Sequence, residues 1–143
     1  MATSSQNEVI LIYLLDTNVA SAIMQDHPSI YAWISALSAG DEIVLCPIVQ
    51  GEILYGIERL PEGKRRVRLS ERARDLFANV RSEAVPPHAD EAYSRMKFSL
   101  YRRGFSLGEN DLWIAATAIA LNATLVSLDG DFGRIDGLSL VRP

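Results

Sequence analysis

The sequence lacks several features that would assign it to a particular class of protein. It has one cysteine, Cys46, so no disulfide can form within the chain, and this suits a reducing cytoplasm. No apolar run reaches the roughly 18 residues that a membrane-spanning helix needs, so no membrane partner is expected. The opening residues "MATSSQNE" lack the basic start of a signal peptide. We therefore expect a cytoplasmic protein with a polar N-terminal extension at residues 1–8 and a single domain over residues 9–143.

The sequence also lacks an excess of positive charge. Its formal net charge is −4 at pH 7, which argues against broad, nonspecific nucleic-acid binding across the whole surface. A nuclease is not excluded, because carboxylates clustered at a metal site are negative until bound cations neutralise them. Hydrophobic residues make up 48% of the 143 residues, enough for one sizeable core.

Short apolar runs alternate with segments of helical spacing along the chain. The run "EVILIYLL", residues 8–15, predicts a strand buried on both faces, and an apolar segment from about Asn110 predicts a core helix. Further strands are expected at residues 41–47, 123–129 and 138–143, with a short strand and a break at 84–87. Further helices are expected at residues 17–24, 29–37, 47–57 and 89–104, and a turn followed by a charged helix at 61–80. This alternation predicts an α/β fold, a three-layer α/β/α sandwich with a mainly parallel central sheet.

Four acidic residues occupy equivalent places in this layout. Asp16 and Asp129 follow predicted strands. Glu52 lies near the start of the helix expected at residues 47–57, and Asp111 lies near the start of the helix expected from about residue 110. Ligands of open parallel sheets bind beyond the carboxyl ends of the strands, where these four side chains would meet. Carboxylates packed together repel unless a cation is bound, and oxygen ligands favour Mg²⁺ or Mn²⁺. Such ions could activate water for hydrolysis of a phosphodiester.

Each of these acids also has a simpler structural interpretation. Asp16 could cap the helix that follows it, and Asp111 could be a first-turn acid favoured by the helix dipole. Asp129 could be an ordinary Asp-Gly turn residue, and Glu52, on a face expected to point inward, could pair with an arginine. Separate roles of this kind do not explain why all four fall at one edge of the sheet.

Four segments carry a resemblance to a known family: "LLDTNVASAI", "CPIVQGEILYGI", "ENDLWIAATAIAL" and "ATLVSLDGDFGRI". In this order they resemble the successive motifs of the PIN-domain ribonucleases, and most closely those of the VapC-type toxins of toxin–antitoxin modules. The resemblance extends from Leu14 to Ile135, nearly the whole chain. It implies a PIN-like fold and metal-dependent hydrolysis of RNA by an activated water, with Mg²⁺ or Mn²⁺ as cofactor.

The resemblance also assigns roles to residues. It places the acidic quartet on Asp16, Glu52, Asp111 and Asp129, where the three aspartates would hold the metal and Glu52 would help coordinate it or orient the water. Asp131 is the alternative to Asp129, because both precede Phe132. Supporting polar positions fall on Thr17, Asn18, Asn110 and Asp131.

The family implies partners as well as a substrate. VapC-type proteins are paired with a small antitoxin whose C-terminal segment occupies the acidic groove, and they commonly form homodimers. The basic run at residues 64–74 could contact RNA phosphates, although a solvated helix face is the more ordinary interpretation.

Three other functions fit less well. A non-catalytic PIN-like module that binds RNA or protein would not need all four acids. A DNA-directed nuclease of the flap-endonuclease superfamily would need added helical elements for which the chain has no room. A phospho-receiver domain would need paired acids after its first strand and a lysine near its last.

Overall fold

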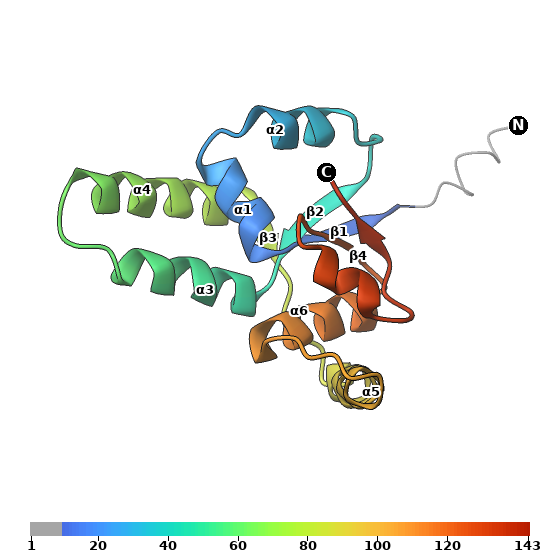
Figure 1. Cartoon of the computed structure of the whole chain (residues 1–143). Coiled ribbons are helices and arrows are strands. Elements are labelled where there is room, and N and C mark those ends of the chain that lie inside the picture. Colours follow the sequence, from blue (N-terminus) through green and yellow to red (C-terminus); the bar gives the residue numbers. More distant parts are fainter. Residues whose placement is uncertain (1–9) are drawn as a thin grey trace, which may run out of the picture.

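The computed structural model describes residues 10–143, and in this part of the chain five short strands form one sheet (Figure 1). The predicted extension at residues 1–8 lies outside the described residues. The sheet order is β3-β2-β1-β4-β5, and every neighbouring pair is parallel. The strands are β1 (Ile12–Leu15), β2 (Glu42–Leu45), β3 (Arg81–Ser82), β4 (Thr124–Val126) and β5 (Leu140–Val141).

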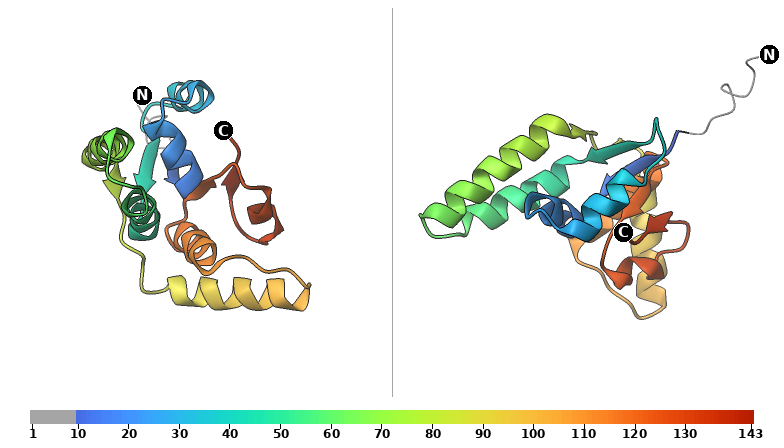
Figure 2. Two further views of the ribbon diagram at one scale, coloured as in Figure 1. Left: turned by 60° about the vertical axis from the view of Figure 1, so that its left-hand side comes forward. Right: turned by 90° about the horizontal axis from the view of Figure 1, so that it is seen from above.

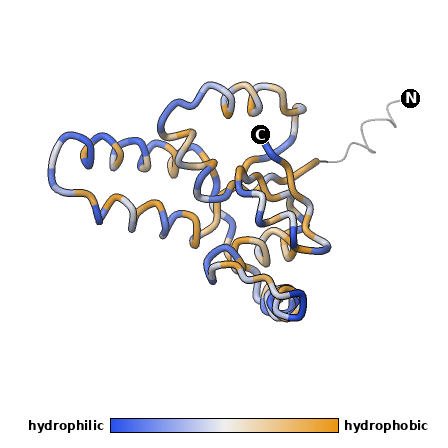
Figure 3. The backbone as a smooth tube through the Cα atoms, in the orientation of Figure 1, coloured by the Kyte–Doolittle hydropathy of each residue, from blue (hydrophilic) through white to orange (hydrophobic). Residues whose placement is uncertain are grey.

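The strand β1 is central because its apolar run has no face that must meet water. Leu14 and Leu15 are fully buried, and Leu14 pairs in register with Val44 of β2 and Leu125 of β4. Strands buried on both faces read as continuous hydrophobic runs, as this one does. Figure 3 shows the hydrophobic residues concentrated in these central strands.

Helices cover both faces of the sheet, which confirms the predicted α/β sandwich. In Figure 1, α1 and α2 lie above the sheet and α5 and α6 below it, while α3 and α4 form a hairpin that projects to one side (Figures 1 and 2). No helix within residues 10–143 has the length and apolar character needed to cross a membrane. The helices are α1 (Thr17–Met24), α2 (Pro28–Ser35), α3 (Pro47–Glu58), α4 (Lys64–Asn79), α5 (Ala89–Arg102), α6 (Glu109–Ala120) and the 3₁₀ helix η2 (Gly130–Arg134).

Local signals in the sequence set several helix ends. Pro28 and Pro47 occupy first-turn positions of α2 and α3, where a missing amide hydrogen costs nothing. Most of α6 is buried, namely Leu112 and residues 114–118, so packing fixes this helix firmly against the sheet. After α6, Asn122 adopts a left-handed backbone with φ of 53°, a conformation that asparagine tolerates at helix C-termini.

Two predicted strands differ from the observed ones. Within the described residues the first strand begins at Ile12, after Ile10 and Leu11, while residues 8 and 9 of its predicted range lie outside the described residues. The short strand predicted within residues 84–87 is wrong in position, because the strand of this region is β3 at Arg81–Ser82, while the predicted break is at Pro86 and Pro87. Pro86 and Pro87 offer no amide hydrogen to a sheet ladder, which explains why pairing ends before them.

Candidate active site

The four predicted acids come from four elements that meet at the carboxyl edge of the sheet. Asp16 directly follows β1, and Asp129 follows the end of β4. The amide of Asp16 donates to the carbonyl of Val126 at 3.0 Å, so these two strand ends lie side by side. Glu52 comes from α3 and Asp111 from the first turn of α6. The structure thus brings the four side chains close enough for their charges to act on one another.

Asp16 is the most buried of the four, with 3% of its surface exposed. One carboxylate oxygen accepts from the amide of Val19 at 2.9 Å and so caps α1, as its simpler interpretation predicts. The other oxygen accepts from the hydroxyl of Ser127 at 2.5 Å. Burial nevertheless raises the pKa of Asp16, and the charges of Asp129 and Glu52 raise it further, against the lowering effect of these hydrogen bonds. Asp16 can therefore cap α1 and belong to the acidic group at the same time.

Ser127 is a site residue that sequence reasoning missed. It is 3% exposed, its hydroxyl donates to Asp16, and the same oxygen accepts from the amide of Asp129 at 2.9 Å. One hydroxyl therefore links two of the acids. The signal that could have revealed it is a serine directly after the buried strand "TLV" and two residues before an aspartate.

Glu52 is held by polar side chains and not by an arginine. The hydroxyl of Thr17 donates to Glu52 Oε1 at 2.5 Å, and Asn110 Nδ2 lies 3.4 Å from Glu52 Oε2. The alternative interpretation, pairing with an arginine, is wrong, because no salt bridge among residues 10–143 includes Glu52. The helix face is also less inward than predicted, since Tyr55 on the same face is 65% exposed. Glu52 thus faces the acidic edge and not the core.

Asp111 lies among the other acids. It is half-buried, and burial is the largest cause of its raised pKa. The charges of Glu52, Asp129, Asp16 and Asp131 raise it further, in that order. A first-turn position favours a carboxylate, so the helix dipole offsets part of this effect.

The two candidates for the fourth acid differ in position. Asp129 contributes to the raised pKa values of both Asp16 and Asp111, whereas Asp131 makes the smallest contribution and only to Asp111. Asp131 is exposed, and its amide donates to Asp129 Oδ1 at 2.9 Å. This hydrogen bond makes Asp129 the cap of η2, in line with its turn interpretation. Asn18 is exposed and forms no side-chain hydrogen bond within residues 10–143.

The group fits a hard divalent cation by its donors and its charge. Its ligand atoms are carboxylate oxygens, and none of the four acids forms a salt bridge with a basic side chain of residues 10–143. Negative charge is therefore left without a counter-charge from the described chain. The arrangement is open: within the described residues, no three acidic, histidine or cysteine side chains converge as ligands of one ion.

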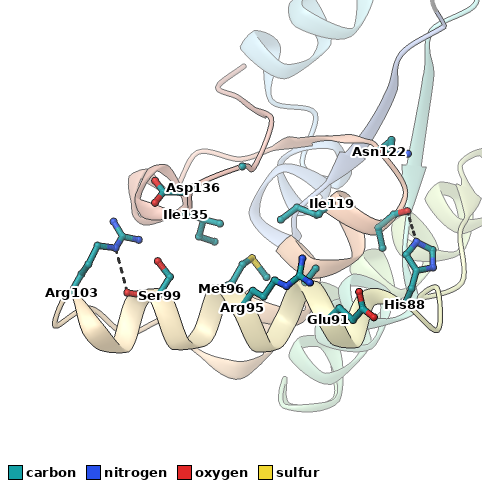
Figure 4. A pocket seen from close by; sticks show the side chains of 13 residues that line it. His88, Glu91, Arg95, Met96, Ser99, Arg103, Ile119, Asn122, Ile135 and Asp136 are labelled. Carbon is teal, nitrogen blue, oxygen red and sulfur yellow. Dashed lines mark hydrogen bonds between the residues drawn. The ribbon is translucent and has the colours of Figure 1, made fainter.

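A separate cavity of about 510 Å³ lies beside α5 (Figure 4). Arg95 and Met96 of α5 line it together with Ile119 near the end of α6 and Asp136 after η2. None of the four acids lines this cavity. It is therefore distinct from the acidic edge.

The basic run on α4 is partly used within the fold. Arg72 pairs with Asp26 at 2.6 Å, and Arg66 pairs with Glu58 of α3 at 3.3 Å. These pairs join α4 to its neighbours and leave fewer free cations for RNA. They agree with the interpretation of α4 as a helix with a solvated charged face.

Comparison with known proteins identifies relatives along nearly the whole chain. A family profile described as the PIN domain matches residues 13–138. The chain is similar to ribonuclease VapC1 of Haemophilus influenzae (strain R2866), with 33% identity over 134 aligned residues that cover 90% of this chain and 95% of that protein.

Two solved structures have the same fold. The structure of VapBC2 from Rickettsia felis, bound to a DNA fragment from its promoter, matches with a TM-score of 0.84 and 29% identity, covering 93% of this chain and 99% of the matched chain. The structure of VapBC-1 from nontypeable Haemophilus influenzae matches with a TM-score of 0.79 and 29% identity, covering 92% of this chain and 98% of the matched chain.

Proposed function

This chain belongs to the PIN-domain family, and from this membership we propose that it is a Mg²⁺- or Mn²⁺-dependent endoribonuclease that acts as the toxin of a toxin–antitoxin pair. The observation that carries the proposal is the group of four carboxylates, without basic partners among residues 10–143, at the strand ends. The similarity to ribonuclease VapC1 supports RNA as the substrate.

The proposal gives each acid a role. Asp16, Asp111 and Asp129 would hold the cation. A bound ion of this kind supplies Lewis-acid stabilisation of negative charge and a lowered pKa of water. Ser127 supports this set because it orients Asp16 and also contacts the backbone of Asp129.

Glu52 would orient the attacking water. Thr17 holds Glu52 Oε1, which leaves Oε2 as the atom that can accept a hydrogen bond or a proton from water. Asn110 approaches Oε2 at 3.4 Å and would help fix its direction. In this account Thr17 and Asn110 are positioning residues, Asn18 would lie beside the bound RNA, and Asp131 would be an outer acid.

A protein partner is part of the proposal. The solved relatives are VapBC structures, which supports an antitoxin as the cognate partner of this chain. Leu54 and Tyr55 on α3 and Val67 on α4 are large apolar side chains that are about half exposed or more, as a protein-binding surface would be. The same exposed apolar side chains are the ground on which we also propose a homodimer. We place this single nuclease domain, over residues 9–143, in the cytoplasm, which its one buried cysteine suits.

Cleavage of RNA by the purified protein tests the proposal. We expect Mn²⁺ or Mg²⁺ to support cleavage, EDTA to abolish it, and Asp16→Asn to reduce both the rate and the affinity for the metal. Asp90→Asn, an exposed first-turn acid of α5, is the matched control and should cleave as the wild type does. Cleavage by Asp16→Asn at the wild-type rate would refute the site. No metal-dependent cleavage of any RNA would favour the non-catalytic binding module.

A further inference from the structure

A basic and aromatic corner lies next to the acidic edge. The guanidinium of Arg134, at the end of η2, lies 4.3 Å from the centroid of the Phe105 ring, in the connection between α5 and α6. Phe105 is 38% exposed, and the Arg134 side chain is 46% exposed. A guanidinium stacked on an aromatic ring is held in one orientation while its edge stays open to solvent. We call Phe105, Arg134 and Arg103 the stacked corner.

A second guanidinium lies near the same ring. Arg103, at the end of α5 (Figure 4), lies 5.8 Å from the Phe105 centroid, and its guanidinium donates to the backbone carbonyl of Arg134. The side chain of Arg103 thereby anchors the backbone that carries Arg134. Two like charges gathered at one ring repel each other, and Asp131, whose carboxylate lies 3.7 Å from Arg134, offsets only part of this repulsion, so a further anion at this corner would relieve the rest.

The donors of Arg134 have little to bind within the fold. Its nearest described carboxylate oxygen belongs to Asp131, at 3.7 Å, which is beyond hydrogen-bond distance. No hydrogen bond within residues 10–143 has the Arg134 guanidinium as donor. A planar, oriented guanidinium with free N–H groups matches the two oxygens of a phosphate, which it binds with charge-assisted hydrogen bonds.

Asp131 links the stacked corner to the acidic group. Asp131 donates its amide to the carboxylate of Asp129, and its charge contributes to the raised pKa of Asp111. Arg134 contacts that same Asp131. An RNA strand with one phosphate among the acids therefore has a neighbouring segment within reach of this arginine.

We propose that Arg134, oriented by Phe105 and Arg103, binds an RNA phosphate adjacent to the one that is cleaved. This inference rests on the proposed ribonuclease function and adds a substrate-binding residue to it. Binding two oxygens of one phosphate requires a planar cation, so Arg134→Lys should retain only part of the RNA binding. On α4, Arg66 and Arg72 pair with acids at 3.3 Å and 2.6 Å, closer than the 3.7 Å ion pair of Arg134 with Asp131, so their guanidinium groups are less available to RNA.

Steady-state cleavage of a short, fluorescein-labelled, single-stranded RNA pool of random sequence, in Mn²⁺ at several salt concentrations, tests this role. For Arg134→Ala we expect KM to rise about tenfold, the size of a lost charge-assisted contact, with kcat within about twofold of the wild type. The dependence of log KM on log salt should become shallower by about 0.7, the value for one lost phosphate contact to a single strand. Arg134→Lys should raise KM less than Arg134→Ala does.

Arg102→Ala is the matched control, because Arg102 also stacks on an aromatic ring, Phe98, at 5.7 Å. It should leave KM and the salt slope unchanged. If the wild type cleaves RNA but Arg134→Ala retains its KM and salt slope, only this inference fails. If Arg134→Ala instead lowers kcat and the melting temperature together, its role is structural and the inference is also wrong. If the wild type cleaves no RNA, the proposed function fails first.

Discussion

Two acids on the first turn of α6 have opposite electrostatic surroundings. Glu109 faces α5, where it accepts hydrogen bonds from Lys97 Nζ and from the Tyr93 hydroxyl, both at 2.5 Å. These bonds, first that of Lys97, lower the pKa of Glu109. Asp111, two residues later, faces Glu52 and the other acids, and its pKa is raised. The helix and its dipole are shared, so the difference comes from what lies opposite each side chain.

The difference separates a structural acid from a candidate functional one. Glu109 has its counter-charge on α5, so its negative charge is neutralised within the protein. Asp111 lies among further carboxylates, and no salt bridge among residues 10–143 includes it. A chain that tolerates such repulsion at a well-packed helix end has charge available for a cation from solution.

The largest expected effect is on catalysis. Asp111→Asn should reduce metal-dependent RNA cleavage by at least about 100-fold, because it removes a proposed metal ligand from the acidic edge. Glu109→Gln changes charge on the same turn and should leave cleavage within about twofold. Initial rates of both variants, measured with saturating Mn²⁺, check the pair. Equal losses would mean that the two sides of the turn do not differ in function.

An intermediate effect is expected for the serine that links two acids. Ser127→Ala removes the hydrogen bond that lowers the pKa of Asp16, so that pKa should rise further and the acidic limb of the pH–rate profile should move to higher pH. Loss of a buried hydrogen bond to a carboxylate should also cost about 1–2 kcal/mol of unfolding free energy. Urea unfolding and a pH–rate profile measure the two effects. Ser139→Ala, at an exposed hydroxyl contact with Thr124, is the control and should change neither by much.

The smallest expected effect is on the melting temperature of the metal-free protein. Burial and neighbouring charges hold the pKa of Asp111 above its ordinary value, so the native state binds this proton more tightly than the unfolded state. Its carboxylate therefore costs stability at pH values above the folded-state pKa, and the cost disappears as the pH falls below the unfolded-state pKa. In EDTA at pH 7, Asp111→Asn should raise the melting temperature by about 2 °C, and the gain should vanish near pH 3.

The matched variant on the other side of the turn should behave differently. Glu109→Gln removes one partner of an exposed ion pair, so its melting temperature should stay equal to that of the wild type or fall slightly. Thermal melts of both variants across pH provide the test. A lower melting temperature for Asp111→Asn at pH 7 in EDTA would show that the acidic group is not under repulsion.

The sequence predicted the features that depend on a few strong signals. The run "EVILIYLL" predicted a central strand because its hydrophobic side chains leave no face for water, and β1 occupies that place. The positions of Asp16, Glu52, Asp111 and Asp129 relative to strands and helices predicted that they would meet at one edge. Both inferences rest on topology, which the alternation of strands and helices specifies.

Features that depend on side-chain direction were not predictable. Ser127 and Thr17 act through single hydrogen bonds to Asp16 and Glu52, and sequence spacing does not specify such bonds. The stack of Arg134 on Phe105 joins residues that are far apart in the chain, and only the packing of η2 beside the end of α5 brings them together. Side-chain contacts of this kind require the folded structure.

Calorimetric titration of Mn²⁺ into the metal-free protein tests the central claim most directly, namely that the acidic edge facing Asp111 binds a divalent cation. We predict measurable binding by the wild type, affinity reduced at least about tenfold in Asp111→Asn, and wild-type affinity in Glu109→Gln. Equal affinities in all three proteins, or a loss confined to Glu109→Gln, would contradict this account.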